Sequence, residues 1–151
     1  MNKNRVVQLL EDLVTAVKEQ PVEAAGKTSS VRFTVLNDGW VLDLKTGLEW
    51  GPTSSKRLNF EEAQKYCASL SARLPTVKEL YGLVDIDKYD PAIDKEIFKD
   101  TESEWYWTSS KYKPDSSYAW CVGFYNGRVF DCRNDSIGNI LPVRDSRAMT
   151  F

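Results

Sequence analysis

Residues able to carry out covalent or acid–base chemistry are few in this chain. It contains no histidine, the commonest general base and the commonest transition-metal ligand in proteins. Its three cysteines, Cys67, Cys121 and Cys132, are too few for a zinc site built from four. No pair of carboxylates is convincingly placed for general acid–base catalysis. We therefore expect that the protein is not an enzyme.

Four aspartates, Asp85, Asp87, Asp90 and Asp94, gather in the segment 85–99. Calcium prefers such oxygen ligands, but the spacing is not that of an EF-hand loop and the central glycine is missing. A solvated loop with capped turns is the favoured interpretation, and calcium near Asp85, Asp87 and Asp90 is the alternative. We expect no other cofactor.

The third group of candidate residues surrounds Asn126-Gly127, the strongest short hairpin signal, because a type I′ turn needs positive φ at both central residues. A two-residue turn would pair Phe124 with Val129 and Cys121 with Cys132. Because side chains alternate along a strand, one face should be a core set of Trp120, Val122, Phe124 and Val129, with Asp131 as its polar exception. The other face should carry a mixed, outward set: Cys121, Gly123, Tyr125, Arg128, Phe130 and Cys132.

Residues 121–147 contain no Lys, Glu, Gln, Met or Trp, although Lys, Glu, Gln and Trp recur up to Trp120. Lys and Glu are usual choices at exposed positions, so their absence from a partly exposed segment is unexpected. An irregular sheet edge is the simplest explanation.

The elements that position these residues follow in chain order. Residues 4–19 carry a short heptad seam, which predicts an amphipathic helix that packs on its own domain or joins a second copy. A linker over 26–30 separates the N-terminal segment 1–30 from a domain over residues 31–151. Residues 31–50 predict short strands around two tight turns, with a core of Trp40, Leu42, Leu48 and Trp50.

Two helices follow, each with a start signal. Asn59 is a predicted N-cap with Glu62 three residues on, and Thr76 with Glu79 is a capping box. The predicted buried stripes are Phe60, Ala63, Cys67 and Leu70 on the first helix, and Val77, Leu80 and Val84 on the second. Short strands around two helices indicate the α+β class.

Charge and hydropathy exclude several kinds of partner. A net charge of −2 gives no bulk attraction to nucleic acid or to anionic membranes. The N-terminus lacks the apolar region of a secretory signal, and no stretch approaches membrane-spanning length. We expect a chain that is cytosolic when made, reaching a virion tail or a cell surface only by another route. Cytosolic synthesis favours free thiols over a disulfide between Cys121 and Cys132.

Six fragments in order resemble one domain family: DLKTGLEW (43–50), FEEAQKYCASL (60–70), ARLPTVKELYGLVD (72–85), YWTSS (106–110), AWCVGFYNG (119–127) and LPVRD (141–145). It is the family typified by the C-terminal domain of the Legionella collagen-like adhesin, and the resemblance covers about residues 31–147. It implies a C-type-lectin-like fold, in which two helices flank a small, mainly antiparallel sheet and a long irregular segment presents a binding surface. Cys67 matches a family cysteine, but residues 141–144 lack its partner, so Cys67 is expected to be a buried free thiol.

Within this family, the last quarter of the chain resembles the variable proteins of diversity-generating retroelements. In those proteins, adenines of a template repeat are randomised, and Asn codons are the main targets. Randomised Asn codons cannot yield Lys, Glu, Gln, Met or Trp, the five types missing from residues 121–147. The resemblance implies a fixed skeleton that includes Trp120, Val122, Phe124, Gly127 and Val129. Most other positions up to Leu141 would vary, Gly138 and Leu141 among them.

The implied function is recognition of a protein or glycan ligand on another cell, through a diversified C-terminal surface. Tyr125, Arg128 and Phe130 are the expected anchors, although Phe130 could instead be buried under the loop 134–140. The predicted ligand-binding residues are Tyr118, Cys121, Gly123, Tyr125, Arg128, Phe130, Asp131, Cys132, Arg133, Asp135, Ser136, Ile137 and Ile140.

Two other functions are weighed against this one. The first is a glycan-binding adhesin module of fixed specificity. The second is an enzyme that uses the Cys121 and Cys132 thiols, because the related formylglycine-generating enzymes share the broad fold and use paired cysteines. The missing histidine speaks against the enzyme.

Overall fold

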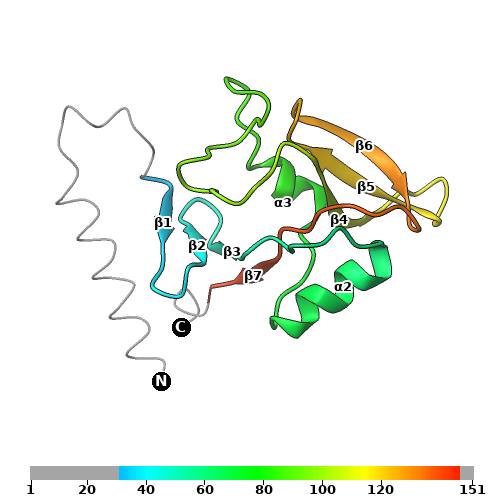
Figure 1. Ribbon diagram of the computed structural model, residues 1–151, viewed down its shortest axis with the longest axis horizontal. Helices are drawn as coiled ribbons and strands as arrows, with labels where there is room; N and C mark the ends of the chain where they lie inside the picture. The colour runs from blue at the N-terminus through cyan, green and yellow to red at the C-terminus, as the bar shows by residue number, and fades with distance from the viewer. Residues whose placement is uncertain (1–30, 147–151) are drawn as a thin grey trace. The chain divides into compact units, whose positions relative to one another are not determined.

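The structure is a computed structural model of the chain, and it describes residues 31–146. The predicted helix over 4–19, its possible self-association and the linker lie outside the described residues. The described chain divides into two compact units, residues 31–51 with 144–146, and Pro52–Val143. Figure 1 follows the chain from β1 in blue to β7 in red.

The first unit is built on a sheet of short strands. β1 (Phe33–Val35), β2 (Val41–Asp43), β3 (Leu48–Trp50) and β7 (Val143–Asp145) lie in the order β1-β2-β3-β7. The pairs β1–β2 and β2–β3 are antiparallel, and their turns place Gly39 and Gly47 at φ of +90° and +78°. Only glycine adopts such angles without strain. The four predicted core residues of this segment are buried, as expected: Trp40, Leu42, Leu48 and Trp50.

One arginine organises the polar interior of the first unit. Arg144 donates from Nε and Nη2 to Oε1 of the buried Glu49, at 3.0 and 2.8 Å. Its guanidinium carbon also lies 3.7 Å from the ring centroid of Trp40. The buried carboxylate is thereby compensated by a charge-assisted pair.

The second unit begins with the two predicted helices, α2 (Phe60–Ser69) and α3 (Val77–Tyr81). Both capping boxes are confirmed: Asn59 and Glu62 satisfy each other's backbone N–H groups, and so do Thr76 and Glu79. These bonds supply partners for donors that a helix cannot satisfy internally.

The predicted helix stripes are confirmed in their centres. Phe60, Ala63, Cys67 and Leu80 are buried. The flanking members of both stripes are only half-buried, since they lie at or beyond the helix ends: Leu70, Val77 and Val84.

A three-stranded antiparallel sheet forms the centre of the second unit. Its strands are β4 (Trp105–Lys111), β5 (Tyr118–Gly123) and β6 (Arg128–Arg133), in the order β4-β5-β6. β6 is therefore an edge strand in the described part of the chain. The segment 138–140 runs along β4, where the backbone N–H of Trp107 donates to the carbonyl of Asn139 at 3.0 Å.

The predicted hairpin is present, but its predicted register was wrong by two residues. Val122 pairs with Val129 and Cys121 with Phe130, so residues 124–127 form the connecting loop. The Phe124 side chain is fully buried, and its carbonyl accepts the N–H of Ala92 at 2.6 Å. These contacts hold Phe124 out of the strand ladder, a tertiary effect that the Asn-Gly pattern does not encode.

Both faces of this sheet are covered. On one face, Trp107, Ala119 and Cys121 join α2 residues Phe60 and Ala63 in a buried cluster. Tyr106 and Val122 lie on the other face because side chains alternate along each strand, and the ring of Tyr106 packs edge-on against Phe124, with centroids 5.4 Å apart. Strand β5 is buried at its last three residues and so does not show the simple inward–outward alternation assumed from sequence, whereas the edge strand β6 alternates.

In the part of the chain that the structure describes, no helix is both long and apolar enough to cross a membrane.

Candidate ligand-binding surface

Most of the exposed residues predicted to bind a ligand lie on the edge strand β6 and on the loops at its two ends. From Val129 to Arg133 the strand alternates between exposed and half-buried residues, because alternate side chains face opposite sides of the sheet and Phe130 and Cys132 pack against the buried cluster of α2. The exposed side chains of this surface, hereafter the β6 surface, are Tyr125, Asn126, Arg128, Val129, Asp131, Arg133, Asp135 and Ile137.

The loop 124–127 positions the first two predicted anchors. Gly127 has a φ of +74° and donates its N–H to the carbonyl of Gly123 at 2.7 Å, while the Asn126 side-chain oxygen accepts the N–H of Arg128 at 3.1 Å. This tight turn directs Tyr125 and Arg128 outward, and Tyr125 is 40% exposed. No ion pair holds the Arg128 guanidinium among residues 31–146.

The third predicted anchor, Phe130, is half-buried. Its ring packs between Trp105 and Tyr125, with centroid distances of 6.1 and 6.5 Å. It also lies against the α2 cluster. Phe130 therefore supports the surface from beneath and exposes only part of its ring.

Asn134 anchors the far end of the surface. Its side chain accepts from Lys111 Nζ at 3.0 Å and donates to the carbonyl of Ser116 at 3.1 Å. Beyond it, Arg133 and Asp135 form an exposed bidentate pair, with both N–O distances 3.2 Å. Hydrogen bonding to Asp135 raises the pKa of Arg133. The hydrogen bonds of Asn134 thus hold the base of a loop whose exposed residues include the Arg133–Asp135 ion pair.

Tyr118, Ser136 and Ile137 complete the far end. Ile137 is 58% exposed, while Tyr118 and Ser136 are half-buried. The ring of Tyr118 packs edge-on against Tyr112, which in turn packs against Trp120 at 5.1 Å. Among the predicted polar binding residues, Asp131, Arg133 and Asp135 are therefore exposed, whereas Tyr118 is half-buried.

Three predicted binding residues do not face solvent, so that part of the prediction was wrong. Cys121 and Ile140 are fully buried in the α2 cluster, and Gly123 lies beneath the Tyr125 ring. The predicted core residue Val129 is instead 39% exposed. The cause is that α2 covers the sheet face that was predicted to point outward, whereas the opposite face is left open at Val129 on the edge strand.

All three cysteines are free, as expected from the sequence. Cys132 pairs with Ala119 and Cys121 with Phe130, so the two thiols lie diagonally across the strands. The prediction that Cys121 and Cys132 lie directly opposite each other was wrong. Burial raises the pKa of Cys121, and the hydrogen bond between the thiols holds the pKa of Cys132 below its ordinary value. Burial raises the pKa of Cys67 to about 12.

The aspartates of segment 85–99 cap turns. Asp85 accepts the N–H of Asp87 at 3.0 Å, Asp94 accepts that of Glu96 at 3.0 Å, and Asp90 accepts a hydrogen bond from Ser103. Within residues 31–146, no three acidic or cysteine side chains gather as they would around a metal ion. The contacts of Asp85 and Asp94 fit the capped-loop interpretation.

Sequence reasoning missed two exposed apolar residues in that same segment. Ile86 is 84% exposed and Tyr89 is 81% exposed. The pattern Asp-Ile-Asp-Lys-Tyr-Asp carried the necessary information, because large apolar residues alternate there with charged ones.

Comparisons with known proteins agree with this geometry. A family model described as the Lcl C-terminal domain matches residues 39–144. Among solved structures, the C-type-lectin-like domain of mouse CD72a is similar, with a TM-score of 0.50 and 18% identity, covering 74% of this chain and 94% of that one. At that identity the likeness shows the fold alone. No curated protein sequence matches the chain.

The predicted α+β, C-type-lectin-like fold is thus confirmed. The family match spans the sheet, both helices and the β6 surface, which is well over half of the chain. The protein is a member of the Lcl C-terminal domain family.

Proposed function

We propose that this protein recognises a receptor or ligand through the β6 surface, and that this surface is diversified by a retroelement. The observation that carries the proposal is a coincidence of two sets. Six of the eight exposed side chains of the surface are at positions that the codon pattern marks as variable, and the exceptions are Asn126 and Val129. The fully buried Val122 and Phe124 are positions that it marks as fixed.

Such a division is what a changeable binding site requires. The buried Trp107, Val122 and Phe124 hold the sheet, each contributing roughly 1.5–3 kcal/mol or more through burial. Substitutions at exposed positions usually change stability by about 0.5 kcal/mol or less. The side chains that meet a ligand can therefore change without loss of the frame.

The partner under this proposal is a protein or glycan on another cell. Tyr and Arg are the residue types enriched where interfaces bind most strongly, and both are exposed here, Tyr125 in the hairpin loop and Arg128 at the start of β6. The charged residues Asp131, Arg133 and Asp135 supply a polar rim. Display on a virion tail or a cell surface is part of the same proposal.

One observation favours a second candidate, an adhesin module of fixed specificity. A Cβ at Gly138 would lie 2.3 Å from the Trp105 ring, although the codon pattern marks position 138 as variable. Cys121, Ile140 and Leu141 are likewise buried at variable positions. Random replacement at these four sites would damage packing.

Sequencing the DNA that flanks this gene in independent isolates tests the proposal. We expect a reverse transcriptase gene and a near-repeat with AAC or AAT codons at positions 125, 128, 131, 133, 135 and 137. Between isolates those six codons should differ, while the codons for Trp107, Val122 and Phe124, which serve as the internal control, should not. A gene without a repeat and with an invariant β6 surface would establish the fixed-specificity candidate instead.

A further inference from the structure

The loop 85–91, hereafter the aspartate loop, carries the two most exposed large apolar side chains of the second unit. Ile86 and Tyr89 are 84% and 81% exposed, against 40% for Tyr125. Isolated exposed apolar residues are ordinary on protein surfaces, but two that are each more than four-fifths exposed on one short loop are unusual.

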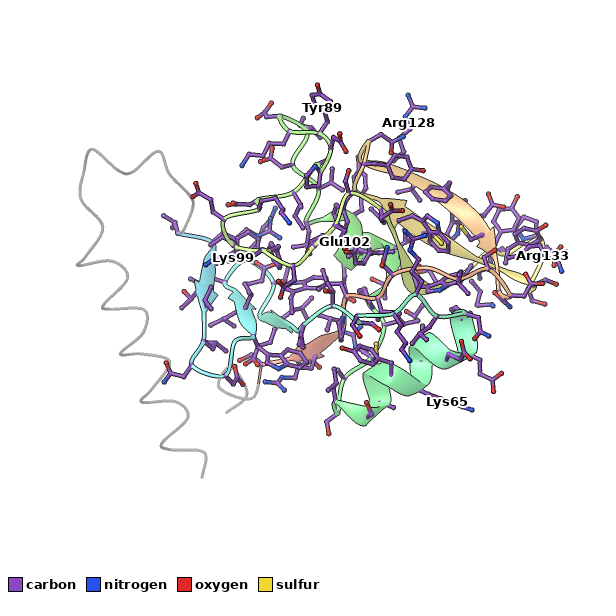
Figure 2. The ribbon with its side chains drawn as sticks, viewed as in Figure 1. Lys65, Tyr89, Lys99, Glu102, Arg128 and Arg133 are labelled. Carbon is purple, nitrogen blue, oxygen red and sulfur yellow. The ribbon has the colours of Figure 1, made fainter. Side chains whose placement is uncertain are left out.

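The aspartate loop is joined to the hairpin loop 124–127 by short contacts. The N–H of Ala92 donates to the Phe124 carbonyl at 2.6 Å, and the N–H of Asp85 donates to the Ala92 carbonyl at 2.9 Å. A Cβ at Gly127 would lie 3.1 Å from Val84 and 3.6 Å from Ala92. In Figure 2, Tyr89 and Arg128 project from the same end of this unit. The base of the aspartate loop therefore lies against the hairpin loop.

Hydrogen bonds within the aspartate loop hold the exposed residues in place. Asp85 accepts the N–H of Asp87 through its side chain and that of Lys88 through its carbonyl, both at 3.0 Å, and Ser103 donates to Asp90. A depression of about 380 Å³ adjoins Tyr89, lined also by Pro91 and Ile93. Because hydrogen bonds already hold the backbone of this loop, its exposed side chains should lose little conformational entropy when they bind a partner.

The chemistry of these exposed side chains favours a protein partner. Ile86 offers aliphatic area, which a polar sugar surface does not match, whereas protein interfaces bury such area in their centres. Arg128 adds a cation that has no ion-pair partner among residues 31–146, and a carboxylate complements it. Lys88, in contrast, already lies 3.9 Å from Asp85.

We propose that Ile86 and Tyr89 form a constant anchor beside the variable hairpin, and that together they bind a protein surface presenting an apolar side chain next to a carboxylate. This inference rests on the proposed function, because it assumes that the hairpin loop is part of the binding site. The codon bias begins only after Trp120 and the aspartate loop contains Lys88, so the anchor stays the same while Arg128 and Tyr125 change.

A phage-displayed library of disulfide-cyclised peptides, selected on the full chain, supplies the probe. We expect enriched peptides to pair an Asp or Glu with a Leu, Ile or aromatic residue. Their affinity should fall about tenfold or more for Ile86→Ser and for Tyr89→Ser, and similarly for Arg128→Ala. Val35→Ser, which replaces an exposed apolar residue of the other unit, is the matched control and should leave affinity unchanged.

The variants separate this inference from the function on which it rests. If the peptides lose affinity in Arg128→Ala and Tyr125→Ala but not in Ile86→Ser or Tyr89→Ser, the constant anchor is overturned. The proposed binding site on the hairpin then still stands. Failure to enrich any peptide that depends on either loop overturns both. Binding of defined glycans on an array through Tyr89, lost in Tyr89→Ser, would overturn the assignment of a protein partner.

Discussion

The indole of Trp105 lies against the backbone of Gly138, so closely that a Cβ at position 138 would be 2.3 Å from its Cζ3 atom. The same ring packs edge-on against Trp107 and Phe130, with centroids 5.0 and 6.1 Å away. Trp105 is thus held from three sides, and Gly138 is the side that admits no additional atom.

Gly138→Ala should therefore destabilise the protein by about 1–3 kcal/mol, the usual cost of forcing atoms into a packed region. Urea unfolding measures the loss. Asp135→Ala, an exposed change in the same loop, is the control and should cost no more than about 0.5 kcal/mol. Equal stability of the two variants would show that the Trp105 ring moves aside freely.

Neighbouring residues Phe124 and Tyr125 should respond oppositely to truncation. Phe124 is fully buried and Tyr125 is 40% exposed. Phe124→Ala should cost about 3–5 kcal/mol through the cavity it leaves, whereas Tyr125→Ala should cost less than about 1 kcal/mol. Thermal unfolding of the two variants checks this, and a larger loss for Tyr125→Ala would reverse the assignment of frame and surface.

Acid stability should depend on the ion pair between Arg32 and Asp43. Burial alone would raise the pKa of Asp43, but hydrogen bonds at 2.8 Å from Arg32 Nε and Nη2 and the charge of that arginine outweigh burial, so the pKa lies below 3.8. A depressed carboxyl pKa adds stability above the unfolded value of about 3.9, and this stability is lost as pH falls through the folded value.

Arg32→Ala should accordingly cost about 2 kcal/mol near neutral pH, and its difference from the wild type should shrink as Asp43 becomes protonated. Urea unfolding followed from neutral to strongly acidic pH measures both values. Arg57→Ala, which removes an exposed pair with Glu104 at 3.4 Å, is the control and should cost little at any pH. A pH-independent difference for Arg32→Ala would exclude the ion pair as the cause.

Thiol reactivity should distinguish Cys132 from the other two cysteines. Cys132 is half-buried with a lowered pKa, whereas burial raises the pKa of Cys67 and of Cys121. A disulfide reagent at mildly alkaline pH should modify one thiol rapidly and the others only on unfolding, since the thiolate is the reactive form. Cys132→Ser should abolish the rapid phase and Cys67→Ser should retain it; survival of that phase in Cys132→Ser would contradict the assignment.

Local features of the fold were predictable from the sequence. The capping boxes at Asn59 and Thr76 depend on residues three positions apart, so the pattern alone specifies them. The turns at Gly39 and Gly47 depend on φ angles that favour glycine. The family resemblance, carried by six fragments, then supplied the arrangement of these elements.

The hairpin register and the outward face could not be predicted, because distant residues decide them. Ala92 draws Phe124 out of the ladder through one backbone hydrogen bond. Helix α2 covers the face that carries Cys121. The exposure of the candidate residues was consequently predicted well at Tyr125, Arg128, Asp135 and Ile137, and poorly towards the end of β5, at Cys121 and Gly123.

The position of β6 at the margin of its sheet has one more consequence. A marginal strand offers unpaired backbone groups to any neighbouring chain, and charged side chains are a common means of preventing such pairing. Arg128, Asp131 and Arg133 occupy that strand here and are all exposed. Side chains on β6 must therefore also keep separate copies of the protein from pairing through this strand, in addition to allowing the chain to fold and to recognise a partner.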